Sequence, residues 1–297
     1  MKPQVLAREF VADFERALLG PDGEALVRAL QRVALRQAPA AEDAVSLALA
    51  ERSGWIVEGR ATARGQIVID AVREYAFWVQ RERLVVPRDA HEALRRLTRL
   101  EGRTILEVGA GFGVNGLAAL RDGARSFTGL DLELGYLQLS EAFTKRERLP
   151  RLRLACGASE ALPFRDESFD LVLCSAVLQY VRPQETLREI ARVMQPGGAL
   201  VLVAGTMAQN LLTHLDRGAA MLRPRALVGL ARSLANGFFL QTLGEKPFDA
   251  RRSSTTSSAA QTSRRHVERC LGSARLEVLE VKTVSRYDTL YHARKPM

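Results

Sequence analysis

The sequence has few cysteines and no apolar run as long as a membrane-spanning helix needs. Its three cysteines, Cys156, Cys174 and Cys270, lie far apart, and no CxxC pair or Cys/His cluster accompanies them. An odd number at this spacing favours a reducing interior over a disulfide framework, and it predicts no metal site. The first residues, MKPQVLAREFVADFER, include acids and lack the apolar core of a signal peptide. We therefore predict a cytoplasmic protein, with contact with a membrane surface left open.

An excess of one charge sign is also absent from most of the chain. Basic and acidic residues number 16 and 15 in residues 1–102, and 12 and 12 in residues 103–207. Residues 208–297 hold 15 basic against 7 acidic residues, so nearly all of the net charge of +9 lies there. A local basic surface beside an active site can concentrate anionic partners.

Residues 1–102 are predicted as a helical extension ahead of the core. Phe10, Phe14 and Leu18 recur at helical spacing. From Ala44 the pattern predicts a helix, a short strand pair around WIVEGRATARG and another helix, an order that resembles a degenerate winged helix. A DNA-binding regulator would use this region together with the basic tail. The extension is nearly neutral, however, whereas a phosphate backbone requires a basic face, so we expect no nucleic-acid partner.

Residues 103–207 alternate apolar strand segments with amphipathic helix segments. The strands are TILEV, SFTGLD, LRLACG, FDLVLCS and ALVLVAG, with helices such as VNGLAAL and ETLREIARVM between them. Such alternation predicts an α/β fold with a doubly wound, mostly parallel sheet, whose ligand-binding loops lie at the carboxyl ends of the strands. Residues 208–262 are predicted as a helical lid insertion. Residues 263–297 are predicted as a last helix and an antiparallel strand pair that completes the sheet.

A glycine-rich loop, ILEVGAGFGVNG, follows the first strand of this core and fits two different cofactors. From Gly111 its letters spell GxGxxG, the dinucleotide fingerprint, but that motif normally begins directly after the strand and here begins two residues late. From Glu107 they spell ExGxGxG, with a turn made by Gly109, Ala110, Gly111 and Gly113. A carboxylate at this place can hold an ammonium group, whereas it would repel the pyrophosphate of a dinucleotide.

Later blocks decide between the two cofactors. Asp131 in TGLDLELG ends the second strand, where a carboxylate can accept hydrogen bonds from both ribose hydroxyls. GASEALPF followed by SFDLV resembles the GDAExLPF block and its strand in S-adenosylmethionine (SAM) methyltransferases, and LREIARVMQPGGALVLV resembles the segment after it. Residues 103–207 therefore resemble the class I SAM-dependent methyltransferase family of the small-molecule type. The resemblance implies a Rossmann-like core, SAM as cofactor and an enzyme that transfers a methyl group.

The resemblance also implies roles for individual residues. Glu107 and the backbone of residues 109–113 would hold the methionine part of SAM. Asp131 and Leu132 would hold the ribose. Ser175, at the end of the fourth strand, would lie near the methionine and the methyl group.

On the adenine side, Ser159 and Glu160 would lie beside the base. Here the sequence departs from the family, because Ala158 occupies the position of the usual Asp that accepts the adenine amino group. The resemblance therefore predicts a hydrogen bond that Ala158 itself cannot supply.

Methyl transfer requires no catalytic triad, but a hydroxyl acceptor would require a base. Tyr180 replaces the usual His near the end of the fourth motif, and His214, His266 and His292 are the other candidates. Of these, Tyr180 and His266 are the two candidate catalytic residues that we prefer.

The acceptor must be inferred from the insertion at residues 208–262, where Leu, Met and Phe-rich segments carry several arginines. We expect a small hydrophobic acceptor, of natural-product, lipid or isoprenoid type, with an anionic group that arginines bind. A basic lid resting on anionic lipid is a second interpretation, and an ordinary solvated helical cap is a third. The helical extension makes a homodimer an expectation.

Two other functions stay open at this point. A family member could bind SAM for a regulatory role or for another reaction, as the departures at Ala158 and Tyr180 would allow. An NAD-dependent oxidoreductase would use the GxGxxG frame and Asp131, but it leaves Glu107 and the ALPF and PGG blocks unexplained.

Overall fold

The computed structural model describes residues 5–81, 99–150, 152–206, 224–244, 246–248, 260, 262–284 and 288–297. Predictions about the remaining residues, among them His214 and much of the insertion at 208–262, lie outside this part of the chain. The chain divides into two compact units. One comprises Met1, Val86–Gly109 and Gly157–Met297, and the other comprises Lys2–Val85 and Ala110–Cys156.

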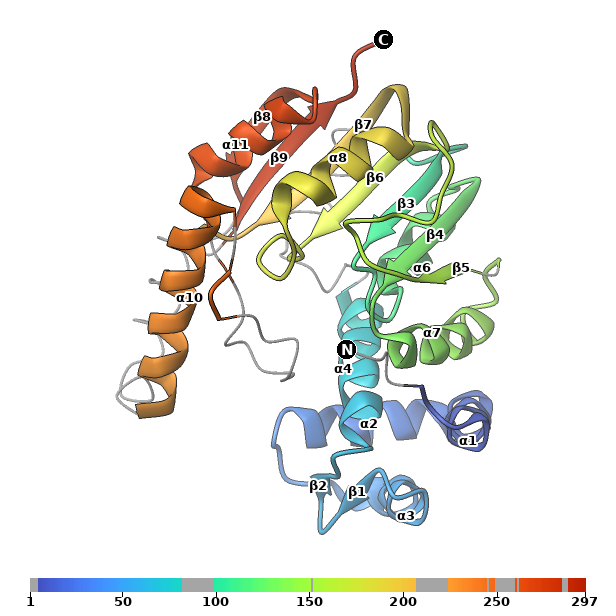
Figure 1. Ribbon diagram of the computed structural model, residues 1–297. Helices are drawn as coiled ribbons and strands as arrows, with labels where there is room; N and C mark the ends of the chain where they lie inside the picture. Colours follow the sequence, from blue (N-terminus) through green and yellow to red (C-terminus); the bar gives the residue numbers. More distant parts are fainter. Residues whose placement is uncertain are drawn as a thin grey trace. The chain divides into compact units, whose positions relative to one another are not determined.

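The first unit contains five neighbouring strands of the central sheet (Figure 1). Across the sheet they follow in the order β3 (Thr104–Val108), β6 (Phe169–Ser175), β7 (Met194–Ala204), β9 (Thr289–Arg294) and β8 (Glu277–Thr283). β3, β6 and β7 are parallel, whereas β9 runs antiparallel to both β7 and β8. The inner strands are continuous apolar runs, as expected where helices cover both faces of a sheet. The predicted antiparallel end of the sheet is confirmed.

The described helices of this unit are α8 (Pro183–Val193), α10 (Pro224–Leu243) and α11 (Arg264–Ser273). α8 begins with Pro183 at a position where the missing N–H costs nothing, and it buries Leu187 and Ile190. α11 packs against α8 and begins at Ser263, whose side chain accepts the backbone N–H of His266. The short helix predicted around RRHVERCLG is confirmed, and α10 confirms the helical part of the insertion over its own length.

The second unit joins the N-terminal helices to part of the core. Its elements are α1 (Arg8–Leu19), α2 (Gly23–Ala34), η1 (Ala41–Asp43), α3 (Ala44–Arg52), β1 (Ile56–Val57), β2 (Arg60–Ala61), α4 (Gln66–Arg81), α6 (Val114–Arg121), β4 (Ser126–Asp131), α7 (Leu134–Arg146) and β5 (Arg153–Cys156). β4 and β5 are parallel. The predicted order of helix, strand pair and helix from Ala44 is present as α3, β1, β2 and α4.

Aromatic side chains hold this second unit together. Phe14 of α1 meets Trp55 edge-on at 6.0 Å and Phe143 of α7 at 5.7 Å between ring centroids. Tyr75 of α4 stacks on the other side of the cluster, 4.5 Å from Phe143. Because Trp55, Phe14 and Phe143 are fully buried, the N-terminal helices share one apolar core with α7.

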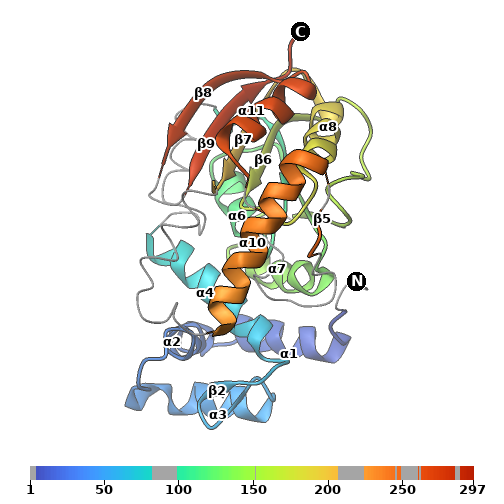
Figure 2. The same ribbon diagram turned by 60° about the vertical axis from the view of Figure 1, so that its left-hand side comes forward.

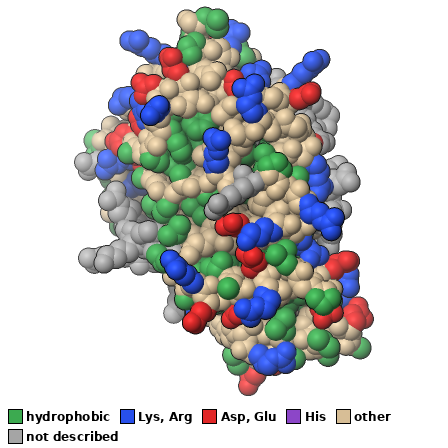
Figure 3. All heavy atoms as spheres, turned by 90° about the vertical axis from the view of Figure 1, so that its right-hand side faces the viewer, with side chains coloured by type: hydrophobic (Ala, Val, Ile, Leu, Met, Phe, Trp, Pro, Cys, Tyr) green, Lys and Arg blue, Asp and Glu red, His purple; other side chains and the backbone are tan. Residues whose placement is uncertain are grey.

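The complete strand order, β5-β4-β3-β6-β7-β9-β8, confirms the Rossmann-like α/β fold with a mostly parallel sheet. Within the described residues, no helix is long and apolar enough to cross a membrane. On the face drawn in Figure 3, basic and acidic side chains alternate with apolar patches, so this face has no single sign of charge.

Candidate functional site

The glycine loop leaves β3 with three residues in the left-handed region. Gly109, Gly111 and Gly113 have φ values of 76°, 53° and 70°, which side-chain-bearing residues rarely adopt. A Cβ at Gly109 would lie 2.2 Å from Cγ2 of Val177, whereas a Cβ at Gly111 would meet nothing within 4 Å. The backbone at Gly111 is therefore bare and open on one side, which is what close approach of a ligand requires. The ligand loop follows β3, which continues one residue past Glu107.

Asp131, the last residue of β4, ties this loop to the neighbouring strand. Its two carboxylate oxygens accept the backbone N–H groups of Gly111 at 2.8 Å and of Glu133 at 2.9 Å. Each oxygen keeps a further lone pair for another donor, such as a ribose hydroxyl. Leu132, the next residue, is 48% exposed, and Cys156 of β5 lies beside Asp131 in the strand register.

Glu107 is a buried carboxylate in the middle of an apolar strand. It is 2% exposed and pairs with Leu173 of β6 in the parallel register. Together with burial, its charge raises the pKa of the Cys174 thiol to about 12. Ser175 ends β6 one residue later, and its buried hydroxyl has no hydrogen-bond partner among the described residues. A buried charge and an unsatisfied hydroxyl at the ends of adjacent strands fit a polar ligand.

Ser159 and Glu160, the residues expected beside the adenine, form hydrogen bonds with residues at the start of α8. Ser159 is buried and shares a hydrogen bond of 3.0 Å with the hydroxyl of Thr186 on α8. Glu160 accepts the N–H of Arg182, the residue that precedes α8, and the hydroxyl of Ser159. Ala158 is exposed. The hydrogen bond that joins Glu160 to the residue preceding α8 was not predicted from the sequence, because the two residues lie 22 positions apart.

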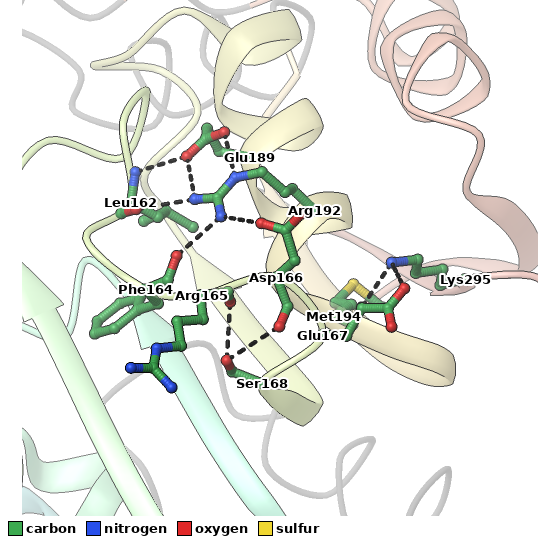
Figure 4. A network of polar contacts seen from close by, with 10 residues as sticks. All are labelled: Leu162, Phe164, Arg165, Asp166, Glu167, Ser168, Glu189, Arg192, Met194 and Lys295. Atoms are coloured by element: carbon green, nitrogen blue, oxygen red, sulfur yellow. Dashed lines mark hydrogen bonds and ion pairs between the residues drawn. The ribbon is translucent and has the colours of Figure 1, made fainter.

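Arg192 of α8 holds the ALPF segment in place (Figure 4). Its Nε and Nη2 donate to both carboxylate oxygens of Glu189, and its Nη1 donates to Asp166 at 2.6 Å. The same guanidinium donates to the carbonyls of Leu162 and Phe164, each at 2.9 Å. Glu189 also accepts the N–H of Leu162, and the hydrogen bonds from Arg192 lower the pKa of Glu189. Sequence reasoning missed this arginine, because its partners lie up to 30 residues away in the chain.

A second missed feature is a carboxyl group of α4 in the electrostatic field of Asp131. Burial, assisted by the charges of Asp70 and Asp131 and opposed by Arg73, raises the pKa of Glu74 from 4.5 to about 7. Tyr136 of α7 lies in the same field, and burial is the main cause of its raised pKa. Periodicity alone could not find this group, because the sequence does not tell which polar residue of a helix is turned inward.

The two candidate bases occupy different surroundings. Tyr180 lies in the turn after β6 and is 51% exposed. His266 lies in the first turn of α11, half-buried, with Nε2 3.5 Å from Sγ of Cys270. Burial and the charge of Arg269 lower the pKa of His266, which keeps the ring neutral at pH 7. His292 lies in β9, and burial lowers its pKa as well.

The segment after α10 returns to the turn that contains Tyr180. The carbonyl of Gln179 accepts the backbone N–H of Ala260 at 2.6 Å and Nζ of Lys246 at 3.3 Å. Gln241 of α10 accepts both the N–H and the hydroxyl of Ser263. The described residues Lys246 and Ala260 are thus held at the carboxyl end of β6, where ligands bind in sheets of this kind.

A cavity of about 350 Å³ lies at the opposite end of the parallel strands, where β7 begins. Its lining includes the cations Arg188, Arg192, Arg275 and Lys295, and Lys295 donates to the carbonyl of Met194 at the start of β7. This cavity is therefore separate from the glycine loop. The described residues contain no group of three or more His, Cys, Asp or Glu that could hold a metal ion.

Residues 106–202 match the protein family described as a methyltransferase domain. Over these residues the core is similar to class I SAM-dependent methyltransferases. Methyltransferases of this kind use SAM, and the bare backbone at Gly111, the buried Glu107 and the further lone pairs of Asp131 are each compatible with that cofactor. Among curated relatives of the methyltransferase core, the phthiotriol/phenolphthiotriol dimycocerosates methyltransferase of Mycobacterium tuberculosis is 42% identical over 101 residues. These residues are 33% of this chain and 36% of the relative, so the match spans about a third of each.

Solved structures share the fold at low sequence identity. The cyclase SpnF covers 71% of this chain and 82% of its own at 19% identity, with a TM-score of 0.52. The geranyl diphosphate C-methyltransferase of Streptomyces coelicolor A3(2), a complex with S-adenosyl-L-homocysteine (SAH), covers 70% and 75% at 13% identity, with a TM-score of 0.50. At these identities the likeness concerns the fold alone.

Proposed function

We propose that this protein transfers the methyl group of SAM to a small hydrophobic acceptor. The observation that carries the proposal is the arrangement at the glycine loop, where Asp131 holds the N–H of Gly111 and the bare backbone stays open. The match of residues 106–202 to the methyltransferase domain supports it.

Bound SAM supplies a methyl group on a sulfonium that is already activated for displacement. The protein therefore has to align the acceptor and exclude water, which can provide most of the acceleration. In this proposal Glu107 binds the ammonium of the methionine part, and Asp131 accepts the ribose hydroxyls. The hydroxyl of Ser175 lies at the end of β6, where it can accept or donate a hydrogen bond near the reacting atoms.

For a hydroxyl acceptor, a base would remove the proton as the new bond forms. Tyr180 and His266 stay our two candidates. His266 has the more suitable protonation state, because its lowered pKa leaves a neutral ring at pH 7. Tyr180 has the more suitable place, next to the Gln179 carbonyl that holds the insertion.

The proposed acceptor is hydrophobic because of what the insertion presents. α10 carries Leu, Val and Phe side chains, and the relative from Mycobacterium tuberculosis is named for phthiotriol and phenolphthiotriol dimycocerosates. An anionic group on the acceptor would find Arg265 exposed in the first turn of α11.

A second candidate function is a reaction of the same fold without methyl transfer. Two observations support this second function. The cyclase SpnF shares the fold, and the exposed Ala158 stands where the family has an acceptor for the adenine amino group. The two functions differ in one product, because only methyl transfer releases SAH.

The test is calorimetric titration with SAM, SAH and NADH, followed by an SAH-release assay over a panel of hydrophobic acceptors. We expect micromolar binding of SAM and SAH, no binding of NADH, and at least about tenfold weaker binding in Asp131→Ala and Glu107→Ala, each of which loses charge-assisted hydrogen bonds. Glu51→Ala, an exposed change on α3, is the matched control. Tight SAH binding without SAH release from any acceptor would favour the second function, and NADH binding would refute both.

A further inference from the structure

α10 buries polar side chains on its inward face and exposes several large apolar side chains to solvent. On the inward face Asn236 is fully buried, and its amide exchanges two hydrogen bonds of 2.9 Å with the backbone of Phe248. Ser233 is buried on the same face, and Gln241 binds Ser263. The polar groups of the helix are therefore used to attach it to its own chain.

Five large apolar side chains are exposed near the two ends of α10, the long helix seen at full length in Figure 2, and the exposed Arg232 and Thr242 lie on the same face. The exposed fractions are 49% for Leu227, 49% for Val228, 59% for Phe238, 37% for Phe239 and 69% for Leu243. At 100° per residue, Leu227 and Phe238 share one line along the helix, and the other three extend the same face. Phe238 and Phe239 meet edge-on with ring centroids 5.6 Å apart.

An ordinary surface helix buries its apolar stripe and exposes its polar one, whereas α10 buries Asn236 and Ser233 and exposes two adjacent Phe side chains. A single exposed Leu or Val needs no explanation, but five exposed large apolar side chains on one side of a 20-residue helix indicate contact with an apolar partner. The inward polar contacts fix the helix in this orientation, because rotating it would break the Asn236 pair and expose an unsatisfied backbone.

Charge selects the kind of partner. The sequence of α10 contains two arginines, at 225 and 232, and no Asp or Glu. Arg232 is exposed and lies over the ring of Phe248, 5.9 Å from its centroid. A second copy of this chain would bring another basic, acid-free helix against this one. An anionic lipid surface offers both the apolar layer and the opposite charge.

We propose that the outward face of α10, made by Leu227, Val228, Phe238, Phe239 and Leu243, docks on the surface of an anionic lipid bilayer. The helix lies in the plane of the interface, with its aromatic and aliphatic side chains among the acyl chains and Arg232 at the level of the phosphates. This docking goes beyond the proposed function, since it requires neither SAM nor an acceptor. An acceptor dissolved in the bilayer would nevertheless be delivered to the insertion.

The test is cosedimentation of the full chain with phosphatidylcholine vesicles that contain 0 or about 30% phosphatidylglycerol, a fraction chosen to give a strongly anionic surface. We expect binding to the anionic vesicles that weakens at high salt. Leu227→Ser with Phe238→Ser should lower the partition coefficient at least about tenfold, because two half-buried apolar side chains are lost from the interface. Arg232→Glu should lower it about tenfold on anionic vesicles and leave binding to neutral ones unchanged.

The control is Leu35→Ser with Val45→Ser, two exposed apolar residues of the other unit, which should bind as the original chain does. Leu243→Ser, the most exposed position of the face, serves as a milder variant if the double change lowers the melting temperature. Equal binding by the α10 variants and the original chain would overturn the proposal, as would no binding to either vesicle. A concentration-dependent dimer in sedimentation velocity that Phe238→Ser dissociates would assign the face to a second copy.

Discussion

The carboxyl group of Glu74 makes the stability of this protein dependent on pH in a way that one substitution should remove. Glu74 lies on α4, where burial raises its pKa from 4.5 to about 7 with the help of Asp70 and Asp131. Glu74→Gln keeps the shape and a hydrogen-bonding end while it removes the charge. The folded variant should therefore lack the free-energy cost of ionising a buried carboxyl group at this position.

The direction of the effect follows from proton linkage. In the unfolded chain Glu74 ionises near pH 4.5, whereas in the folded protein it stays protonated until about pH 7. The folded state thus binds more protons between these values, and stability falls as pH rises through this window and stays low above it. With about 1.4 kcal/mol per pKa unit, the penalty is about 3 kcal/mol at pH 8 and below about 1 kcal/mol at pH 5.

The assay is urea unfolding of Glu74→Gln and of the original chain at pH 5 and pH 8. We expect the variant to be more stable by about 2–3 kcal/mol at pH 8 and nearly equal at pH 5. Glu9→Gln, an exposed change on α1, should leave the pH dependence unchanged. Parallel stability profiles of the Glu74 variant and the original chain between pH 5 and pH 8 would refute the reasoning, because they would mean that water or a shift of α4 relieves the burial.

Three further outcomes are expected. Cys156 is exposed beside Asp131, whereas Cys174 is buried. Saturating SAH should therefore slow maleimide labelling at Cys156 alone, measured by peptide mass mapping. Unchanged labelling would contradict a ribose at Asp131. Arg192→Lys loses the planar fork that serves four residues and should lower the free energy of unfolding by about 1–3 kcal/mol, measured in urea. Gly109→Ala should abolish SAM binding in calorimetry because its Cβ would meet Val177 at 2.2 Å, and tight binding by this variant would rule out the loop geometry.

Much of the fold could be predicted because local patterns and global topology agree. The apolar runs at β3, β6 and β7 have no polar alternation, which indicates strands covered on both faces. The loop after β3 and the acid at the end of β4 are local motifs, so their adjacency follows from the rule that ligand loops meet at one sheet edge. The hydrogen bond between Asp131 and Gly111 is the geometric form of that expectation.

The features that sequence reasoning missed all depend on orientation or on distant partners. The spacing of apolar residues in α10 predicts a helix with an apolar face, but it does not tell whether that face points toward the protein or toward solvent. The hydrogen bonds between Asn236 and the backbone of Phe248 set the orientation of this face, and no local sequence pattern predicts them. The pKa of Glu74 likewise depends on which side of α4 meets α7, a matter of tertiary packing.

The position of β9 between β7 and β8 constrains how the chain can fold. β8 pairs with β9 and is not a neighbour of β7 in the strand order, so it is attached to the sheet only through β9. β9 and β8 are sequence neighbours, whereas β7 ends 84 residues before β9 begins. The local hairpin should thus form first and close the long loop in one step. Until then the outer edge of β7 presents unpaired backbone groups, which makes an intermediate without the hairpin the species most prone to aggregate.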